Sequence, residues 1–305
     1  MTNFTIIPDL HADRVRLDAS LDQVDGNKIA FLGDFIDAGK AVQSPDDLAV
    51  LKKVKELIES DRAIAVMGNH ELNAILFHRN DRHGAALRNH TATNYDQHRS
   101  FLDQLGLATP LAIYWTEWFL SLPLWIEQNG LRLVHACWDD EAIDVIKQRR
   151  VDGRLHPADL EEIAAKDTPF AKAVETLTSG VELRLPGKIE FHDGKGVLRD
   201  HVRIAWWLAN KGTWREVALS VPNIEELPDT PVAGLDGIPV YLAGQPPVVV
   251  GHYKMKGAPR IDTVQATCLD YPDRYCVYHW SGEPVLSPNN LRSCLPNGED
   301  NQGWL

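Results

Sequence analysis

KIAFLGDFID, at residues 28–37, contains the pattern from which the architecture of this 305-residue chain can be inferred. A short apolar run of the kind that suits a buried strand leads directly into Gly33 and the acidic Asp34. The same arrangement occurs earlier, where Phe4–Pro8 ends at Asp9, and later, where Ala63–Met67 ends at Gly68. Strands that deliver polar residues at their carboxyl ends are typical of an open α/β sheet, whose ligands bind just beyond those ends.

Helical patterns alternate with these strands. Between the second and third strands, Ser44 suits an N-cap and Pro45 the first helical position, and apolar residues then recur at helical spacing through Ile58. Further helices are expected at residues 70–78, 95–107 and 112–122. Helices that cover buried strands imply a layered α/β (α+β) fold, which we expect to form one domain over residues 1–305.

The second half of the chain adds strands and one region of different character. Asn129-Gly130 predicts a two-residue hairpin turn, and the expected strands are 124–128, 131–136, 248–250, 267–270 and 275–280. Residues 139–244 are polar, rich in charge and interrupted by prolines. We expect this segment to be an insertion that caps or walls the functional site instead of extending the main sheet. The last ten or so residues are expected to form a tail.

The acidic composition narrows the range of partners. The chain has 31 basic and 43 acidic side chains, a formal net charge of −12, 44% hydrophobic residues and 24% charged residues. These values are ordinary for a globular protein and argue against electrostatic binding to long nucleic acid or to an anionic membrane. The first ten residues lack the pattern of a signal peptide, no stretch is apolar enough to span a bilayer, and the four cysteines are scattered. We therefore expect a cytoplasmic protein with reduced thiols.

The residues that follow the predicted strands share the ability to bind a metal ion. Just beyond five apolar strands stand the candidate ligands Asp9, His11, Asp34, Asn69, His135 and His252. A single Asp or His after a strand is usually a turn residue. Five such strand ends in succession are hard to obtain by chance, and carboxylate, amide and imidazole ligands suit Mn, Fe or Zn. The sequence thus predicts a metal site at one edge of the sheet.

These segments resemble the ordered motifs of the calcineurin-like metallophosphoesterases. The resemblance rests on five blocks in family order, namely Asp9-Leu10-His11, Gly33-Asp34-Phe35-Ile36-Asp37, Gly68-Asn69-His70-Glu71, Val134-His135-Ala136 and Gly251-His252. The second and third blocks are most similar to the phosphoprotein-phosphatase branch, which includes Ser/Thr protein phosphatases and bacterial diadenosine tetraphosphate hydrolases. The resemblance implies a metallophosphoesterase-like central β-sandwich flanked by helices.

The resemblance also implies roles for the residues of the motifs. Asp9 and His11 would hold one metal, Asp34 would bridge to a second, and the other three candidate ligands would complete the second site. The implied cofactors are two divalent transition metals, Mn, Fe or Zn, and metal-activated hydroxide would attack the phosphorus atom. His70 would protonate the leaving alkoxide, and Asp37 would orient the imidazole of His70.

The main departure from the family pattern is Ala38. In the protein-phosphatase branch an arginine follows the second aspartate and holds the substrate phosphate with two hydrogen bonds, so alanine removes this contact. The candidate cations that could replace it are Lys40, Arg88, Arg199, Arg203 and Lys254. For each of them, a solvated surface position is the alternative, because charged residues are mostly exposed.

The function that these residues imply is hydrolysis of a phosphate ester by a dinuclear-metal enzyme. The favoured hypothesis is a Ser/Thr-phosphatase-like phosphomonoesterase, with a phosphorylated small molecule, a nucleotide or a phosphoprotein as the substrate. The first alternative is a dinucleoside polyphosphate pyrophosphohydrolase or a phosphodiesterase. The second alternative belongs to a different class: a weakly active regulatory or binding protein on the same fold, which the loss of the arginine at Ala38 favours.

Overall fold

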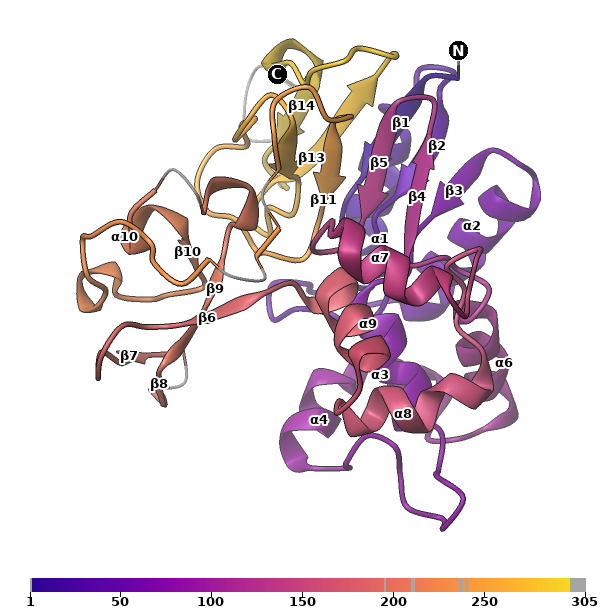
Figure 1. The fold of residues 1–305 in the computed structure, drawn as a ribbon. Helices are drawn as coiled ribbons and strands as arrows, with labels where there is room; N and C mark the ends of the chain where they lie inside the picture. Colours follow the sequence, from indigo (N-terminus) through magenta and orange to yellow (C-terminus); the bar gives the residue numbers. More distant parts are fainter. Residues whose placement is uncertain (1, 195, 210–211, 236–237, 240, 297–305) are drawn as a thin grey trace.

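Two β-sheets form the core of the computed structural model, which describes residues 2–194, 196–209, 212–235, 238–239 and 241–296 (Figure 1). The strands of the first sheet are β1 (Phe4–Ile7), β2 (Lys28–Phe31), β3 (Ala63–Ala65), β13 (Tyr275–Trp280) and β14 (Leu291–Cys294). Their order is β14-β13-β1-β2-β3, and β1, β2 and β3 run parallel to one another. Parallel neighbours end on the same edge of a sheet, so the segments that follow these three strands lie close together.

The second sheet repeats this arrangement with a hairpin at its edge. Its strands are β4 (Trp125–Gln128), β5 (Leu131–Val134), β11 (Val248–Val250) and β12 (Ala266–Cys268), in the order β12-β11-β5-β4. The strands β5, β11 and β12 are parallel, whereas β4 and β5 form an antiparallel hairpin. Asn129 and Gly130 have φ angles of 55° and 87° at the hairpin turn. The predicted two-residue turn is therefore confirmed, because a type I′ turn needs positive φ at both positions.

Hydrogen bonds join the carboxyl-terminal ends of the two sheets. The N–H of Met67 donates to the carbonyl of Pro123 over 2.9 Å, and Leu32 accepts from Nδ1 of His135 over 2.7 Å. Residues of both sheets, including Phe31 and Val249, are fully buried in one hydrophobic core. This pairing of sheets confirms the prediction of a mixed α/β fold, and it brings strand ends that are far apart in sequence into one region.

Helices cover this core and fill the lower part of the view in Figure 1. They are α1 (Arg14–Leu21), α2 (Asp47–Glu59), α3 (Asn69–Phe77), α4 (Ala92–Gln97), α5 (Arg99–Leu105), α6 (Pro110–Phe119), α7 (Asp140–Lys147), α8 (Leu160–Ala165), α9 (Pro169–Ser179) and α10 (Trp214–Val217). Short 3₁₀ turns occupy Pro157–Asp159, Trp206–Leu208, Ile224–Glu226 and Pro288–Asn290. The helix α3 begins immediately after the loop that follows β3, so its first residues point at the edge where the strands end.

Three helix predictions were wrong in their boundaries. The N-cap of α2 is Asp46 and not Ser44, because the carboxylate of Asp46 accepts from the N–H of Ala49 over 2.9 Å. The helix expected at 95–107 is two helices, α4 and α5, which meet at His98 with φ −102° and ψ 14°. The helix expected at 112–122 also begins and ends earlier, at Pro110 and Phe119. Local periodicity locates a helix well, but competing caps and tertiary contacts fix its ends.

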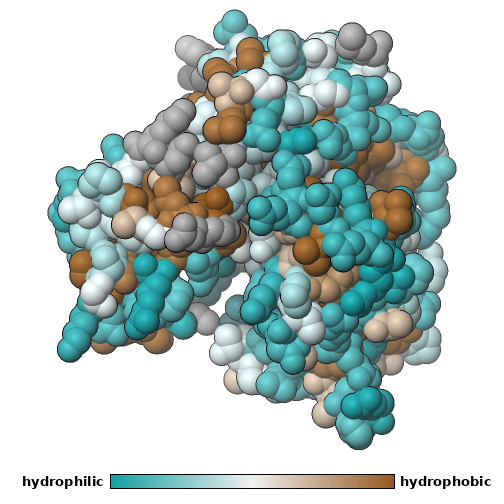
Figure 2. All heavy atoms as spheres, in the orientation of Figure 1, coloured by the Kyte–Doolittle hydropathy of each residue, from teal (hydrophilic) through white to brown (hydrophobic). Residues whose placement is uncertain are grey.

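The region 139–244 contains two kinds of structure. Its first part, α7 to α9, packs into the main core, with Ile146, Val174 and Leu177 fully buried there. The described part of residues 181–235, here called the arm, carries the small strands β6 (Glu182–Arg184), β7 (Phe191–His192), β8 (Leu198–Arg199), β9 (His201–Ile204) and β10 (Ala218–Leu219). The arm projects to the left in Figure 1, and Figure 2 shows a hollow between it and the helices of the lower right. That the region caps the site stays a prediction.

Other expectations concern the thiols, membrane spans and the tail. Cys137, Cys268 and Cys276 are buried free thiols, as the scattered cysteines indicated. Among the described residues, every helix is too short or too polar to cross a bilayer. The expected tail lies almost wholly in residues 297–305, outside the described residues.

Candidate metal centre

The six predicted metal ligands converge at the edge where the strands end. Asp9 and His11 follow β1, Asp34 follows β2, and Asn69 is the first residue of α3. The remaining two ligands, His135 and His252, directly follow β5 and close after β11. The two sheets therefore deliver side chains that are separated by up to 243 positions to a single site, as shown by the hydrogen bonds from His252 N–H to both carboxylate oxygens of Asp9.

One half of the centre gathers around the first carboxylate oxygen of Asp34. Nε2 of His135 lies 3.4 Å from Oδ1 of Asp34 and 3.0 Å from Oδ1 of Asn69. Nδ1 of His252 lies 2.7 Å from the same oxygen of Asn69. The potential ligand atoms of Asp34, His135 and His252 all fall within 4.8 Å of one another.

The other half gathers around the second oxygen of Asp34. Nε2 of His11 lies 4.0 Å from Oδ2 of Asp34 and 3.9 Å from Oδ2 of Asp9. Nε2 of His70 lies 3.8 Å from the same oxygen of Asp34. Because each oxygen of one carboxylate faces a different set of imidazoles, Asp34 has the geometry of a bridging ligand between two cations.

Two orphaned nitrogen atoms indicate that the donor set fits metal ions. Nε2 of His11 and Nε2 of His252 are buried and have no hydrogen-bond partner. A buried polar atom without a partner costs free energy, so such atoms are rare unless an ion or water satisfies them. The combination of neutral imidazole, carboxylate and amide oxygen is a suitable donor set for Mn, Fe or Zn.

The loops that carry these ligands have a strained backbone. His11, Asp34 and His252 have positive φ angles of 48°, 52° and 73°, a region that non-glycine residues rarely adopt. Strain of this kind persists only where surrounding contacts enforce it, and it is concentrated at functional sites. Two glycines permit the close approach: a Cβ at Gly251 would lie 2.0 Å from Oδ1 of Asp9, and a Cβ at Gly68 would lie 2.2 Å from Oδ1 of Asp34.

Burial and mutual charge set the protonation of the site. Burial would raise the pKa of Asp34, but His135 and His70 outweigh it and hold the pKa well below its usual value. Burial lowers the pKa of His135, yet the carboxylate of Asp34 raises it overall to about 10. Burial and the charge of His70 lower the pKa of His11 to about 3, and burial and His135 lower that of His252. Two imidazoles are therefore neutral and available, whereas His135 holds a proton that a cation must displace.

Next to the centre lies the predicted pair of His70 and Asp37. Nδ1 of His70 is 2.8 Å from Oδ2 of Asp37, and the N–H of His70 donates to Oδ1 of Asp34 over 2.9 Å. Burial opposes charging of the imidazole, but Asp34 and Asp37 outweigh it and raise the pKa of His70 to about 9. The imidazole is thus a cation at neutral pH, with Nδ1–H directed at Asp37 and Nε2–H directed at the metal-competent oxygens.

Two buried residues that support the site, Glu71 and Asp270, were missed from the sequence. Glu71 accepts the N–H groups of Asp34, Phe35 and Gly68 over 2.8 to 2.9 Å, although the sequence indicated only a residue at the start of a helix. Asp270 accepts the N–H of Lys254 and, together with burial, raises the pKa of Asp9. Their signal in the sequence is faint, because a polar residue after a strand or at a helix start is common.

The structure places some of the candidate substrate-binding cations near the candidate metal centre and others away from it. Lys40 and Lys254 line a groove of about 480 Å³ together with Asp9 and His11. Arg88 lines a small recess with Asp37 and His70 and is held by the side-chain oxygens of Asn94 and Gln97. The structure brings these three cations to the edge of the metal centre or of the His70–Asp37 pair.

The two arginines of the arm differ from each other. Arg203 contributes to lowering the pKa of His252, after burial and the charge of His135, so its charge acts on the centre. Its Nε is buried and lacks a hydrogen-bond partner, and its terminal nitrogen lies 3.7 Å from Glu182. Arg199 instead is exposed and forms an ion pair with Asp193 over 3.0 Å in the hairpin of β7 and β8. No hydrogen bond or ion pair among the described residues brings Arg199 to the centre.

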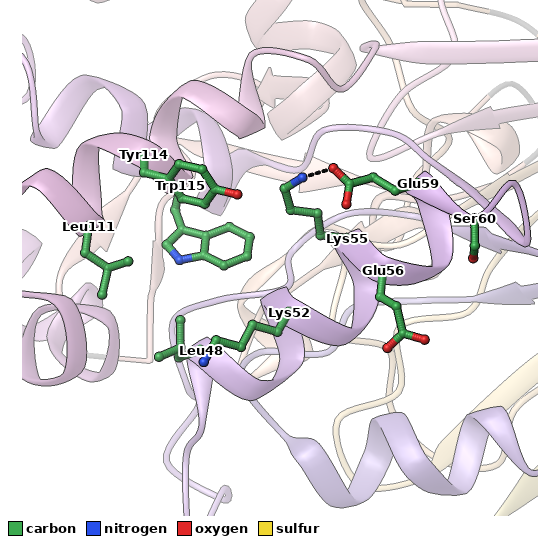
Figure 3. A pocket seen from close by; sticks show the side chains of 9 residues that line it. All are labelled: Leu48, Lys52, Lys55, Glu56, Glu59, Ser60, Leu111, Tyr114 and Trp115. Atoms are coloured by element: carbon green, nitrogen blue, oxygen red, sulfur yellow. Dashed lines mark hydrogen bonds and ion pairs between the residues drawn. The ribbon is translucent and has the colours of Figure 1, made fainter.

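A groove on the surface between α2 and α6 has a different character. It has a volume of about 660 Å³, and Figure 3 shows Lys52 and Leu48 on one side and Trp115 and Tyr114 on the other. Lys55 is paired with Glu59 across its upper rim. None of its lining residues belongs to the metal-competent set, so the site for the chemistry is the strand-end cluster and not this groove.

Three solved structures resemble this chain at 12 to 17% sequence identity. No curated protein matches the chain. One solved structure, of a candidate diadenosine tetraphosphatase, is 17% identical, covers 96% of this chain and 93% of its own, and has a TM-score of 0.44. A Ser/Thr phosphatase from Saccharomyces cerevisiae is 12% identical, covers 96% of this chain and 79% of its own, and has a TM-score of 0.45. The cold-active protein-tyrosine phosphatase of a psychrophilic Shewanella species is 15% identical, covers 98% of this chain and 79% of its own, and has a TM-score of 0.48.

The sequence model of the calcineurin-like phosphoesterases matches residues 2–176, more than half of the chain. The matched part contains five of the six candidate ligands and the His70–Asp37 pair, whereas His252 and the arm lie beyond it. Enzymes of this family are metal-dependent phosphoester hydrolases and generally use a dinuclear centre of divalent metals. The chain therefore belongs to the calcineurin-like phosphoesterase family and is a metal-dependent phosphoester hydrolase.

Proposed function

We propose that this hydrolase is a phosphomonoesterase of the Ser/Thr-phosphatase type, with Asp34 bridging two divalent transition metals. The observation that carries the proposal is the position of Asp34, whose two oxygens face separate imidazole sets. One cation would be held by Asp9, His11 and Asp34, and the other by Asp34 and the remaining three ligands. When bound, such a pair supplies a hydroxide at neutral pH and neutralises phosphoryl charge.

His70 acts as the general acid in this proposal. Its Nδ1–H is held by Oδ2 of Asp37 at 2.8 Å, which leaves Nε2–H as the proton to transfer. The carboxylate of Asp37 stabilises the imidazolium before transfer and fixes the ring in the productive orientation. A leaving alkoxide that receives this proton departs as a neutral alcohol, so the contribution grows as the leaving group becomes more basic.

The phosphate group is held by cations other than the missing arginine. Ala38 occupies the position of that arginine, and its N–H donates to Oγ of Ser100. Lys254 is exposed on the groove beside Asp9 and His11, and its charge contributes to lowering the pKa of His11, after burial and His70. Arg203 approaches from the arm. We expect Lys254→Met and Arg203→Met to raise KM more than they lower kcat, because both contacts exist in the ground state.

The decisive experiment combines metal analysis with a substrate screen. The purified chain is loaded with Mn, and hydrolysis of p-nitrophenyl phosphate, phosphopeptides, mononucleotides, dinucleoside polyphosphates and cyclic nucleotides is compared. We expect about two metal ions per chain and turnover of monoesters. Hydrolysis confined to dinucleoside polyphosphates or to cyclic nucleotides would replace the monoesterase proposal by the corresponding alternative. Absence of bound metal after loading, or of any turnover, would favour a binding protein.

A further inference from the structure

A chain of hydrogen bonds continues from the acid pair into the protein interior. Oδ2 of Asp37 faces His70, while its other oxygen, Oδ1, lies 2.6 Å from Nδ1 of His98. Nε2 of His98 lies 2.9 Å from Nε2 of His78. Nδ1 of His78 in turn accepts the backbone N–H of Ala108 over 2.9 Å. One carboxylate thus joins the acid to two further histidines that lie outside the five motif blocks.

The direction of every bond in this chain is fixed by its last member. The N–H of Ala108 can only donate, so Nδ1 of His78 is an acceptor and the proton of the neutral ring sits on Nε2. His78 then donates to Nε2 of His98, which leaves the proton of His98 on Nδ1. His98 therefore donates to Asp37. A doubly protonated His98 would require His78 to accept at both nitrogens, which a neutral imidazole does not do.

The two histidines are held rigidly. His98 is 4% exposed and His78 is 5% exposed. The ring of His98 stacks on Phe101 with a centroid distance of 4.7 Å and meets the edge of Phe77 at 5.2 Å. Rings packed in this way do not rotate freely, so the donor atom of His98 keeps its place. The chain ends on a backbone amide inside the protein, which makes it unsuited to conduct protons from solvent.

The backbone conformation at Asp37 and His98 is consistent with this arrangement. Asp37 has a φ of 66°, and its N–H is held by Oδ1 of Asp47 over 2.9 Å. At His98 the helix that the sequence pattern predicts as continuous is broken into α4 and α5. The break lies at the residue whose imidazole meets Asp37, although the N–H of His98 still donates to the carbonyl of Asn94 over 3.1 Å. This second, backbone observation is independent of the side-chain distances.

We propose that His98, supported by His78, is a positioning residue for the acid His70: it donates to the outer oxygen of Asp37 and so fixes the inner oxygen against Nδ1 of His70. This inference rests on the proposed function, because it gives His98 a role in leaving-group protonation. A histidine that acts only by filling the interior would not influence which leaving groups the enzyme handles. The distinguishing property is therefore the dependence of turnover on the leaving group.

The test uses two substitutions at one position and a matched control. His98→Phe retains the ring stack on Phe101 and removes the donor, whereas His98→Asn keeps an N–H that can reach Asp37. His90→Phe is the control, since His90 also packs on Phe77, at 4.2 Å, and donates to the Phe77 carbonyl without approaching Asp37. The Mn-loaded full-length proteins are compared on p-nitrophenyl phosphate, whose leaving group needs little protonation, and on phenyl phosphate, which needs more.

For His98→Phe we expect kcat on phenyl phosphate to fall by about 10- to 100-fold, below the full 100- to 10,000-fold contribution of a general acid. The value on p-nitrophenyl phosphate should change much less, KM should stay constant, and His98→Asn should recover most of the loss. Equal losses on both substrates, or none, in an active enzyme would overturn the positioning role alone. A wild-type protein without any phosphate-ester turnover would overturn the proposed function as well.

A spectroscopic measurement gives a readout apart from turnover. In ¹⁵N-labelled metal-free protein, we expect Nδ1 of His98 and Nε2 of His78 to be protonated, and the bond from His98 to Asp37 to give a proton resonance far downfield. This resonance should vanish in His98→Phe and persist in His90→Phe. The opposite tautomer at His98, with the proton on Nε2, would overturn the inference whatever the kinetic result.

Discussion

At the scale of single residues, Asp34 is the point on which both halves of the centre depend. Its Oδ1 faces His135 at 3.4 Å and its Oδ2 faces His11 and His70 at 4.0 and 3.8 Å. It also accepts the N–H of His70, which orients the first turn of α3. Asp37 also has an imidazole at each oxygen, but its partners are His70 and His98, which are not among the candidate metal ligands.

We predict that Asp34→Asn lowers hydrolysis of p-nitrophenyl phosphate by at least about 100-fold and reduces the metal content below two ions per chain, because an amide is a weak bridge between cations. Metal analysis and steady-state kinetics check both effects. Asp18→Asn on α1 is the control, since Asp18 is exposed and contacts Arg14. Unchanged activity in Asp34→Asn would refute the bridging role.

At the scale of elements, the N-terminus of α3 organises the centre through Glu71. The side chain is fully buried and accepts N–H groups from its own helix start and from the loop after β2. Burial and the charge of Asp34 raise the pKa of Glu71 to about 7. The carboxylate thus ties two neighbouring ligand loops together and stabilises their strained conformations.

Glu71→Gln should destabilise the protein by about 1 to 3 kcal/mol, because the new amide presents hydrogens to backbone donors. The free energy of unfolding from urea denaturation measures this effect, and the same variant should bind metal more weakly. Glu56→Gln, at an exposed position of α2 whose side chain pairs with Lys53, serves as the comparison. Equal stability of the two variants would show that the carboxylate is not needed to hold the loops.

The contact between α3 and α5 makes stability depend on pH. Burial, and then the adjacent His98, lower the pKa of His78 to about 4, whereas an unfolded chain takes up this proton near pH 6.5. The unfolded state therefore binds more protons between these values, so the contribution of His78 is complete above pH 6.5 and is lost as the pH falls toward 4. A His78→Gln variant lacks this titrating group, so its stability does not contain this pH-dependent contribution.

We predict that the free energy of unfolding of the wild type, relative to that of His78→Gln, falls by up to about 3 kcal/mol between pH 7 and pH 4. Denaturant unfolding at a series of pH values measures it, and differences between the two proteins remove the contribution of other titrating groups. Parallel pH profiles for the two proteins would contradict a depressed pKa at His78.

At the scale of the whole molecule, the described residues form two hydrophobic cores. The main core contains both sheets and the helices α7 to α9. The arm has its own smaller core, in which Val202, Ile204 and Trp214 are buried. Trp206 and Trp207 belong to the main core and connect the two. The arm can therefore open locally while the sheets and the metal centre stay folded.

Ile204→Ala should lower the free energy of unfolding of the arm by about 2 to 5 kcal/mol, because it leaves a cavity in the smaller core. We expect faster amide hydrogen exchange within residues 181–235 and little change in β1 and β2. Ile6→Ala is the matched variant in the main core, where an equally buried isoleucine supports β1, and it should accelerate exchange throughout. Uniform acceleration in Ile204→Ala would mean that the arm and the sheets unfold as one unit.

Part of the site followed from local sequence, because a strand and the residue just after it are neighbours in the chain. The apolar runs before Asp9, Asp34 and His135 predicted the strands. The six candidate ligands lie together where the strands end, and that they bind metal stays a prediction. Arg199 shows the limit of this reasoning: an arginine in a polar segment carries no local sign of whether it turns inward. Arg203, four residues later, acts on His252, whereas Arg199 is paired at the surface.

The sequence by itself determined the class of fold and the residue types at the strand ends, since strand periodicity and residue chemistry act locally. The pair of His70 and Asp37 came from the resemblance of the motifs to the family. Only the tertiary structure decided where α4 ends and that His98 and His78 stand behind Asp37. These contacts join residues 20 to 61 positions apart. Their geometry depends on how α3 and α5 pack, and no local pattern encodes a packing distance between separate helices.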